Sequence, residues 1–175
     1  MIYSSPSSCG LSKAVVDDFA SKVAAHLGYN VGGPLVPIVE KIGGKVQVQD
    51  ILDFSNPPSG SIRIDGVGRF SIFLASHTGP ARDRFTIAHE LGHYFLHYLY
   101  PKQNGAELQA MEAQRYGSGP VEWEANWFAA GFLMPVPEFT ERYKKLNGSV
   151  ALLADAFGVS TEAARIRAEF AGLSS

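Results

Sequence analysis

The stretch RFTIAHELGHYFLH, residues 84–97, contains three of the five histidines in the chain. Within it, His89, Glu90 and His93 form an H-E-x-x-H pattern. Because residues four apart in an α-helix lie about 40° apart on one face, both imidazoles can bind one metal ion. Glu90 lies beside them, where it can take a proton from a metal-bound water but is badly placed to bind the metal. The pattern predicts a metal-binding helix over residues 84–100.

A catalytic zinc site needs a third protein ligand and leaves one position open for water. His97 lies about 80° around the helix from His89, which favours a packed or hydrogen-bonded histidine. Two glutamates in the weakly patterned connection after this helix are expected to be solvated. Two more open the next helix about 200° apart, so both cannot bind one ion, and spacing does not choose between them. The first pair is Glu107 and Glu112, and the second pair is Glu122 and Glu124.

The remaining pattern indicates helices at both ends of the chain and a small sheet between them. Apolar residues at spacings of three and four predict an amphipathic helix from Ser12 to Leu27, and a short helix follows Pro34. Alternation with a period of two around Val46, Ile62 and Ile72 predicts three strands. The fold class is therefore α+β, with a small antiparallel sheet of about three strands.

Turn residues and prolines divide these elements. NPPSG (residues 56–60) and DGVG (residues 65–68) are typical of turns between strands. HTGPARD (residues 77–83) is expected to be a loop, and Pro101 is expected to end the metal-binding helix. A second long helix is predicted from Pro120 to Met134, and two or three shorter helices should follow it.

The composition indicates a globular protein, with 46% hydrophobic and 18% charged residues. A net charge of -2 gives no electrostatic footprint for nucleic acid or an anionic membrane. The single cysteine, Cys9, excludes a disulfide framework, and without a secretory signal or a membrane-spanning run we expect a cytoplasmic protein. Residues 1–11 are expected to be flexible, and residues 12–175 to form one domain with a helical tail at about 138–173.

Two blocks of sequence in combination resemble the ImmA/IrrE family of metallopeptidases. They are residues 84–97 and the E-x-E-A-N-x-F-A-A-x-x-x-M-P block of residues 122–135, and a weaker resemblance extends over about residues 15–173. The resemblance implies that Glu122 completes the metal site with the two histidines and that Glu90 is the general base. The implied metal is Zn²⁺, with Mn²⁺ or another divalent ion as an alternative in the cell. The chain departs from the family at Gly131-Phe132, where two larger aliphatic residues are usual. We also expect it to be the stand-alone protease form, without a fused N-terminal DNA-binding domain.

The same resemblance implies a substrate and a setting. It implies a zinc endopeptidase that cuts a co-encoded helix-turn-helix repressor or antitoxin, in a mobile element, a stress response or a toxin–antitoxin system. Such an enzyme would contact neither DNA nor a membrane. One alternative is a non-proteolytic regulator that uses the metal fold for binding, although a purely structural site has no use for Glu90. Another is a peptidase for small peptides, which would need a closed pocket rather than an open cleft.

Further residues are expected around the reaction. Asn126 faces the same way as Glu122 and is a candidate hydrogen-bond partner for a histidine ligand. The strand immediately before the metal-binding helix is expected to lie at the sheet edge and to bind an extended substrate. Donors that could stabilise the tetrahedral oxyanion include several tyrosines, a histidine and an arginine. The candidate donors are Tyr94, Tyr98, Tyr116, His77 and Arg82, and the strand residues are Phe70, Ser71, Ile72, Phe73 and Leu74.

The segment LLADAFGVSTEAARIRAEF, residues 152–170, has the outline of a helix-turn-helix. Ser160 is a good N-cap, and Arg165 and Arg167 lie on the helix that follows. The low net charge and the lack of a basic stripe favour a helical pair that packs on the rest of the protein.

Overall fold

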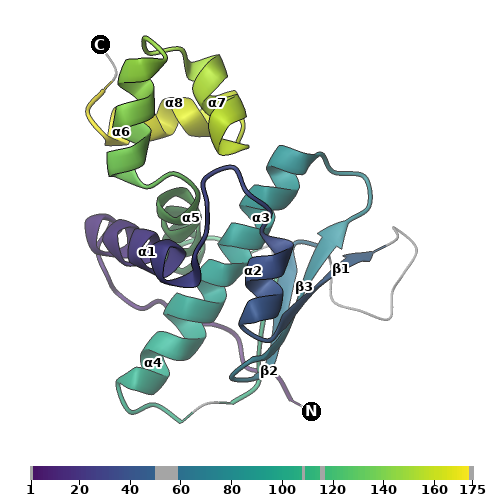
Figure 1. Ribbon diagram of the computed structural model, residues 1–175. Helices are drawn as coiled ribbons and strands as arrows, with labels where there is room; N and C mark the ends of the chain where they lie inside the picture. Colours follow the sequence, from purple (N-terminus) through teal and green to yellow (C-terminus); the bar gives the residue numbers. More distant parts are fainter. Residues whose placement is uncertain (1, 50–58, 108, 115–116, 174–175) are drawn as a thin grey trace.

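The computed structural model describes residues 2–49, 59–107, 109–114 and 117–173. It has the predicted α+β architecture, with one sheet, a long helical rod beside it and three helices gathered at one end (Figure 1). The elements, in chain order, are α1 (Lys13–Leu27), α2 (Val36–Lys41), β1 (Gly44–Gln49), β2 (Ser61–Gly66), β3 (Arg69–Ala75), α3 (Pro80–Gly92), the π-helix η1 (His93–Leu99), α4 (Tyr100–Gln103), β4 (Met111–Gln114), α5 (Pro120–Leu133), α6 (Val136–Lys145), α7 (Val150–Phe157) and α8 (Thr161–Phe170).

The sheet differs from the prediction in strand number and in strand direction. Its order is β1-β3-β2-β4, and β1 runs parallel to β3 while the other neighbours are antiparallel. The fourth strand lies in the connection where we expected no regular structure. In β4 only Met111 and Ala113 are buried, and four residues of alternation are too short to stand out in a sequence.

Strand β3 lies inside the sheet, so the prediction that residues 70–74 form a substrate-binding edge is wrong. Ile72 pairs with Val46 of β1 on one side and with Ile62 of β2 on the other. Three consecutive strands joined as a meander would leave the third at the edge. Instead β1 pairs with β3, past β2, and the edge strands are β1 and β4. The turn predicted at residues 56–60 lies mostly outside the described residues, whereas that at residues 65–68 joins β2 to β3.

Helix α1 begins and ends where its capping residues predict. The Ser12 side chain accepts a hydrogen bond from the backbone N–H of Val15, and Gly28 ends the helix in the left-handed conformation at φ 73°. Its buried face packs against α5. There Gly131 allows close approach, because a Cβ atom at this position would lie 2.8 Å from the backbone oxygen of Asp17.

The helical rod that carries the histidines consists of α3, η1 and α4. It is longer than predicted and changes from α-helix to π-helix and back. It begins at Pro80, within the predicted loop, because a proline in the first helical turn needs no N–H donor. From His93 to Leu99 it is a π-helix, and it then continues through Pro101 to Gln103. Pro101 does not end the rod because it falls in the first turn of α4, where its missing donor is tolerated.

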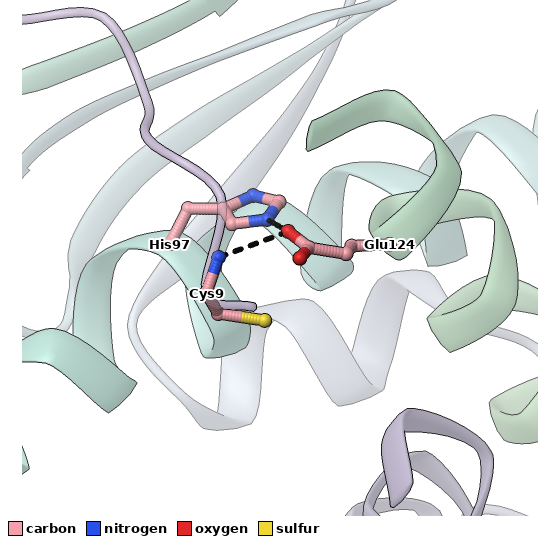
Figure 2. A group of neighbouring side chains, drawn as sticks. All are labelled: Cys9, His97 and Glu124. Carbon is pink, nitrogen blue, oxygen red and sulfur yellow. Dashed lines mark hydrogen bonds and ion pairs between the residues drawn. The ribbon is translucent and has the colours of Figure 1, made fainter. Parts of the chain in front are cut away.

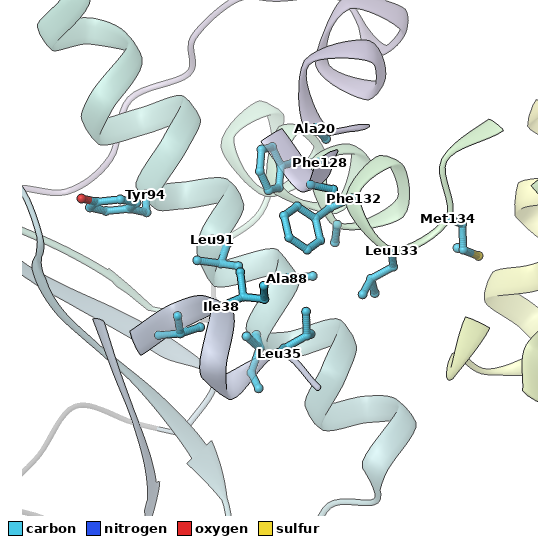
Figure 3. Packing of buried hydrophobic residues seen from close by; sticks show 14 of the residues in the cluster. Ala20, Leu35, Ile38, Ala88, Leu91, Tyr94, Phe128, Phe132, Leu133 and Met134 are labelled. Carbon is cyan, nitrogen blue, oxygen red and sulfur yellow. The ribbon is translucent and has the colours of Figure 1, made fainter. Parts of the chain in front are cut away.

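The main hydrophobic core lies between α1, α2, α3 and α5 (Figure 3). Small residues of one helix face large residues of another, and the rings of Phe128 and Phe132 lie in the centre of the labelled group. Gly92 faces α5, because a Cβ atom there would lie 3.0 Å from the Cα atom of Ala125. The core therefore fixes α3 against α5, which are the two helices that carry the candidate ligands.

The three C-terminal helices are joined to this core by two arginines. Arg84 of α3 donates to the backbone oxygens of Gly33 and Gly158. Arg167 of α8 is 3% exposed and donates to Met134 O at 2.7 Å and to Asp17 Oδ1 at 2.5 Å. Packing on the core is thus the arrangement that the tail adopts. Among the described helices, none combines the length and apolar character needed to span a membrane.

Candidate metal centre

Three side chains from two helices converge on one point. His89 is in α3, His93 begins η1, and Glu122 lies in the first turn of α5. The Nε2 atoms of the two histidines are 3.1 Å apart, and the Glu122 carboxylate oxygens lie 3.2 Å from His89 Nε2 and 3.5 Å from His93 Nε2. Atoms bound tetrahedrally to one zinc ion at about 2.0 Å are about 3.3 Å apart. The three donors are therefore spaced as ligands of a single small cation.

The structure separates the two glutamates that the sequence left as alternatives. Glu122 faces His89 and His93, whereas Glu124 points to the other side of α5 and contacts His97. The two earlier glutamates are not near the histidines. Glu107 is exposed, and Glu112 forms an ion pair with Arg63 across β4 and β2.

Glu90 lines the same small pocket as His89 and Glu122. The pocket has a volume of about 270 Å³ and is lined by Phe85, Thr86, His89, Glu90, Gly117, Glu122 and Asn126. Glu90 is 2% exposed, so it is buried in the wall of the pocket that His89 and Glu122 also line. A carboxylate at this position can exchange protons with a water molecule in the pocket.

Each histidine of the centre has a hydrogen-bond partner for its second nitrogen. His89 Nδ1 is 2.9 Å from the side-chain oxygen of Asn126, as we expected from the direction in which Asn126 faces. His93 Nδ1 is 3.0 Å from His97 Nδ1, and His97 Nε2 is 2.8 Å from Glu124 Oε2. His97 is thus a buried, hydrogen-bonded histidine, as predicted.

The surroundings move the pKa values of these groups in different directions. Burial, with the positive charges that His89 and His97 can carry, lowers the pKa of His93 well below its usual value. Burial also acts to lower the pKa of His89, but its hydrogen bond to Glu122 and the charge of Glu90 outweigh burial and raise it. His93 is therefore a neutral imidazole at neutral pH, which is the form that binds metals.

A second cluster is formed by Cys9, His97 and Glu124 (Figure 2), and it adjoins this centre through the contact between His97 and His93. Glu124 is 2% exposed. Burial acts to raise its pKa, but hydrogen bonds led by those from Ser8 and His97 outweigh burial and lower it. This cluster was not predicted, because Ser8 and Cys9 lie in the segment that we expected to be flexible.

That segment is instead fastened at two places. The Ser4 backbone forms a bridge to Met111 at the edge of β4. Residues 8–10 contact Glu124, with Ser8 Oγ 2.6 Å from Oε1. Backbone donors in a loop have no local pattern in the sequence, so the contact could be seen only in the folded chain.

The four candidate oxyanion donors that the structure describes do not line the pocket. The Tyr94 hydroxyl accepts a hydrogen bond from the Gly68 backbone, and its ring stacks on Phe70 of the sheet. Tyr98 stacks on Tyr94 and is also turned away from the pocket lining. His77 and Arg82 are exposed at the start of the rod and do not line the pocket among the described residues, and Tyr116 lies outside the described residues. Periodicity places a residue on a helix but does not say which neighbour covers it.

Two grooves extend from the pocket in different directions. The polar groove, of about 560 Å³, shares Gly117 and Glu122 with the pocket and runs along β4 and the N-terminal segment. The apolar groove, of about 470 Å³, shares Phe85 and Asn126 with the pocket and runs between α5 and α8. The pocket shares lining residues with both grooves, and we refer to the three together as the cleft.

Comparison with known proteins gives a family and a fold. The Peptidase_M78 family model, described as the IrrE N-terminal-like domain, matches residues 45–169. The comparison with curated proteins gives no match. Among solved structures, a Mycobacterium tuberculosis transcriptional regulator is similar over 86% of this chain, with a TM-score of 0.60 and 21% sequence identity. The present chain spans 45% of that protein, and the likeness shows a shared fold.

Proposed function

Because the chain belongs to the Peptidase_M78 family of IrrE N-terminal-like domains, we propose that it is a zinc-dependent endopeptidase. His89, His93 and Glu122 would hold the ion, since their donor atoms have the mutual distances of ligands in a tetrahedral site. Two imidazoles and one carboxylate are also a donor set that suits zinc, and three protein ligands leave a position open for water.

A zinc ion at this position would supply a water of pKa about 7 and would polarise the carbonyl group to be cleaved. Glu90 would act as the general base, with its carboxylate taking a proton from water in the pocket and returning it to the departing amine. Asn126 accepts a hydrogen bond from His89 Nδ1 and thereby turns His89 Nε2 towards the ion.

The cleft is the observation that carries the proposal for an endopeptidase. A closed pocket would admit only the end of a peptide, whereas here grooves leave the pocket through Glu122 on one side and through Asn126 on the other. A polypeptide can therefore pass through the centre with both of its ends outside. The walls of the apolar groove, which include Trp127 and Ile166, favour substrates with apolar side chains on that side of the cleaved bond.

We take a helix-turn-helix repressor or antitoxin, encoded beside this protein, as the substrate that the family resemblance favours. The similarity in fold to a transcriptional regulator favours a second function, regulation by binding alone. The two differ in their need for Glu90, which is a reacting group only in the protease.

The test is cleavage of polypeptides whose ends are blocked. Zinc-loaded protein is incubated with the neighbouring repressor and with acetylated and amidated peptides that tile its sequence, and the products are identified by mass spectrometry. Internal cleavage at one bond is the expected result. Removal of single residues from unblocked peptides, with blocked peptides left intact, would contradict the assignment as an endopeptidase. Stable binding of the repressor without cleavage would favour the regulator.

A further inference from the structure

The carboxylate of Glu124 begins a series of hydrogen bonds that runs through His97 to His93 at the metal centre. Three donors of the N-terminal segment contact it: Ser8 Oγ at 2.6 Å and Gly10 N at 2.9 Å from Oε1, and Cys9 N at 3.0 Å from Oε2. A backbone N–H can only donate, so each oxygen of Glu124 is an acceptor. The Cys9 contact is drawn in Figure 2, where it starts from the backbone nitrogen.

The fourth contact of Glu124 determines which ring nitrogen of His97 carries the hydrogen. His97 Nε2 is 2.8 Å from Oε2, and because Oε2 is an acceptor, Nε2 must carry the hydrogen. A neutral imidazole has one N–H, so His97 Nδ1 presents a lone pair. The nitrogen that faces this lone pair, at 3.0 Å, is Nδ1 of His93.

The contact with His97 determines in turn which ring nitrogen of His93 carries the hydrogen. Its Nδ1 must donate to the lone pair of His97, which leaves His93 Nε2 without a hydrogen. That Nε2 atom points to the candidate metal position, 3.1 Å from His89 Nε2 and 3.5 Å from Glu122. With the opposite tautomer, a hydrogen would occupy the side of His93 that must bind the ion.

We propose that Glu124 and His97 are positioning residues that place the hydrogen of His93 on Nδ1, and that docking of residues 8–10 onto Glu124 fixes this arrangement. The proposal rests on the proposed function, because it assumes that His93 binds a metal through Nε2. It assigns a role to the N-terminal segment that lies outside the family match at residues 45–169. It also gives His97 a role at the metal centre without making it a ligand.

A different use of the cluster would be a second metal site, since donor atoms of Cys9, His97 and Glu124 lie within 4.8 Å of one another. The hydrogen bonds argue against it. Glu124 already accepts four donors, and two of these are backbone N–H groups that cannot give up their hydrogens to make room for an ion. The cluster therefore has the chemistry of an anchor for hydrogen bonds.

Nuclear magnetic resonance tests the tautomers directly. Long-range ¹H–¹⁵N correlation spectra of the full-length metal-free protein, at a pH where both histidines are neutral, show which ring nitrogen carries the hydrogen. The expected result is Nε2–H for His97 and Nδ1–H for His93. Observation of the hydrogen on His93 Nε2 would overturn the proposal, and this measurement needs no variant that has to fold.

Metal affinity gives the second arm of the test. Competition with a chromophoric chelator should show that Glu124→Gln binds zinc roughly 10- to 100-fold more weakly than wild type, the usual effect of losing a partner behind a ligand. Asp17→Asn is the matched control, because it removes a carboxylate from a buried contact with Arg167 and does not touch the histidines. Its zinc affinity should equal that of wild type. Equal zinc affinity in folded Glu124→Gln would overturn the proposal.

Metal stoichiometry separates this proposal from its alternatives. Elemental analysis should give one zinc per chain for wild type and for Cys9→Ala. Two zinc ions per chain, with one lost in Cys9→Ala, would show that the cluster is a metal site and would overturn the proposal. Failure of wild type to bind zinc would refute the proposed function itself, whereas one zinc with the wrong His93 tautomer would refute only the role of Glu124 and His97.

Discussion

Replacement of Gly92 by alanine tests how tightly the two ligand-bearing helices are held together. A Cβ atom at residue 92 would lie 3.0 Å from Ala125 Cα, 3.1 Å from Ala125 O and 3.1 Å from Phe128 Cβ, where ordinary contacts begin at 3.4 Å. The shortfall is about 0.4 Å, and two of the three atoms belong to the backbone of α5. The neighbours cannot rotate away, so α3 and α5 must separate.

Two opposing effects determine how much Gly92→Ala changes the free energy of unfolding. Overpacking of this kind costs about 1–3 kcal/mol, while alanine in a helix is favoured over glycine by about 1 kcal/mol. Because two of the three contacted atoms are backbone atoms, we take the upper half of the overpacking range and expect Gly92→Ala to lower the free energy of unfolding by about 1–2 kcal/mol, which is a fall in Tm of roughly 2–8 °C for a chain of this size. Separation of the helices also moves Glu122 away from His89 and His93, so zinc should raise the Tm of the variant less than it raises that of wild type.

The assay is thermal unfolding of both proteins with and without zinc, followed by circular dichroism. Gly79→Ala is the control, because a Cβ atom there meets nothing within 4 Å and the residue begins the same helix. The control replaces an N-cap glycine and should therefore lose up to about 1 kcal/mol, but it should keep the full effect of zinc. If Gly92→Ala unfolds at the wild-type temperature with an unchanged response to zinc, the spacing of α3 and α5 does not control the centre.

Three further expectations concern the metal ligands, the pairing of β3 and binding to DNA. Glu122→Ala should lose its zinc on dialysis, whereas His97→Ala should bind zinc more weakly but still contain it after dialysis, as measured by elemental analysis; zinc loss only in the His97 variant would reverse the ligand assignment. Ile72→Pro and Phe73→Pro should both unfold at much lower denaturant concentration than wild type, because β3 is paired on each side and either proline removes a donor within the sheet; a wild-type midpoint for either variant would mean that one edge of β3 is open. Duplex DNA should bind only weakly and without sequence preference in gel-shift titrations at physiological salt, because Arg167 is buried and Arg165 is paired with Glu162 and Glu169; tight and specific binding would restore the DNA-binding interpretation of residues 160–170.

The parts of the structure that were predicted correctly depend on local signals. Helix α1 begins after Ser12 and ends at Gly28, as predicted, because capping depends on hydrogen bonds within a few residues. The pairing of His89 with His93 follows from helical periodicity. The start of α5 at Pro120 follows from the lack of an N–H on proline.

The parts that were missed depend on contacts between distant residues. The parallel pairing of β1 with β3 leaves no mark on either strand, so β3 was wrongly placed at the edge of the sheet. The π-helix that carries His97 depends on hydrogen bonds that no residue type specifies alone. The anchor at Glu124 joins residues more than 110 positions apart and uses backbone N–H groups, which every residue except proline has.

We assign Glu90 as the base of a centre that cuts peptide bonds, and a paired measurement on wild type and Glu90→Gln tests this assignment. Wild type and Glu90→Gln are purified together, analysed for zinc and incubated with the same repressor. We expect about one zinc per chain in both proteins and cleavage by wild type only, with the rate for Glu90→Gln lower by at least about 100-fold. Cleavage by zinc-loaded Glu90→Gln at the wild-type rate would show that Glu90 is not the base.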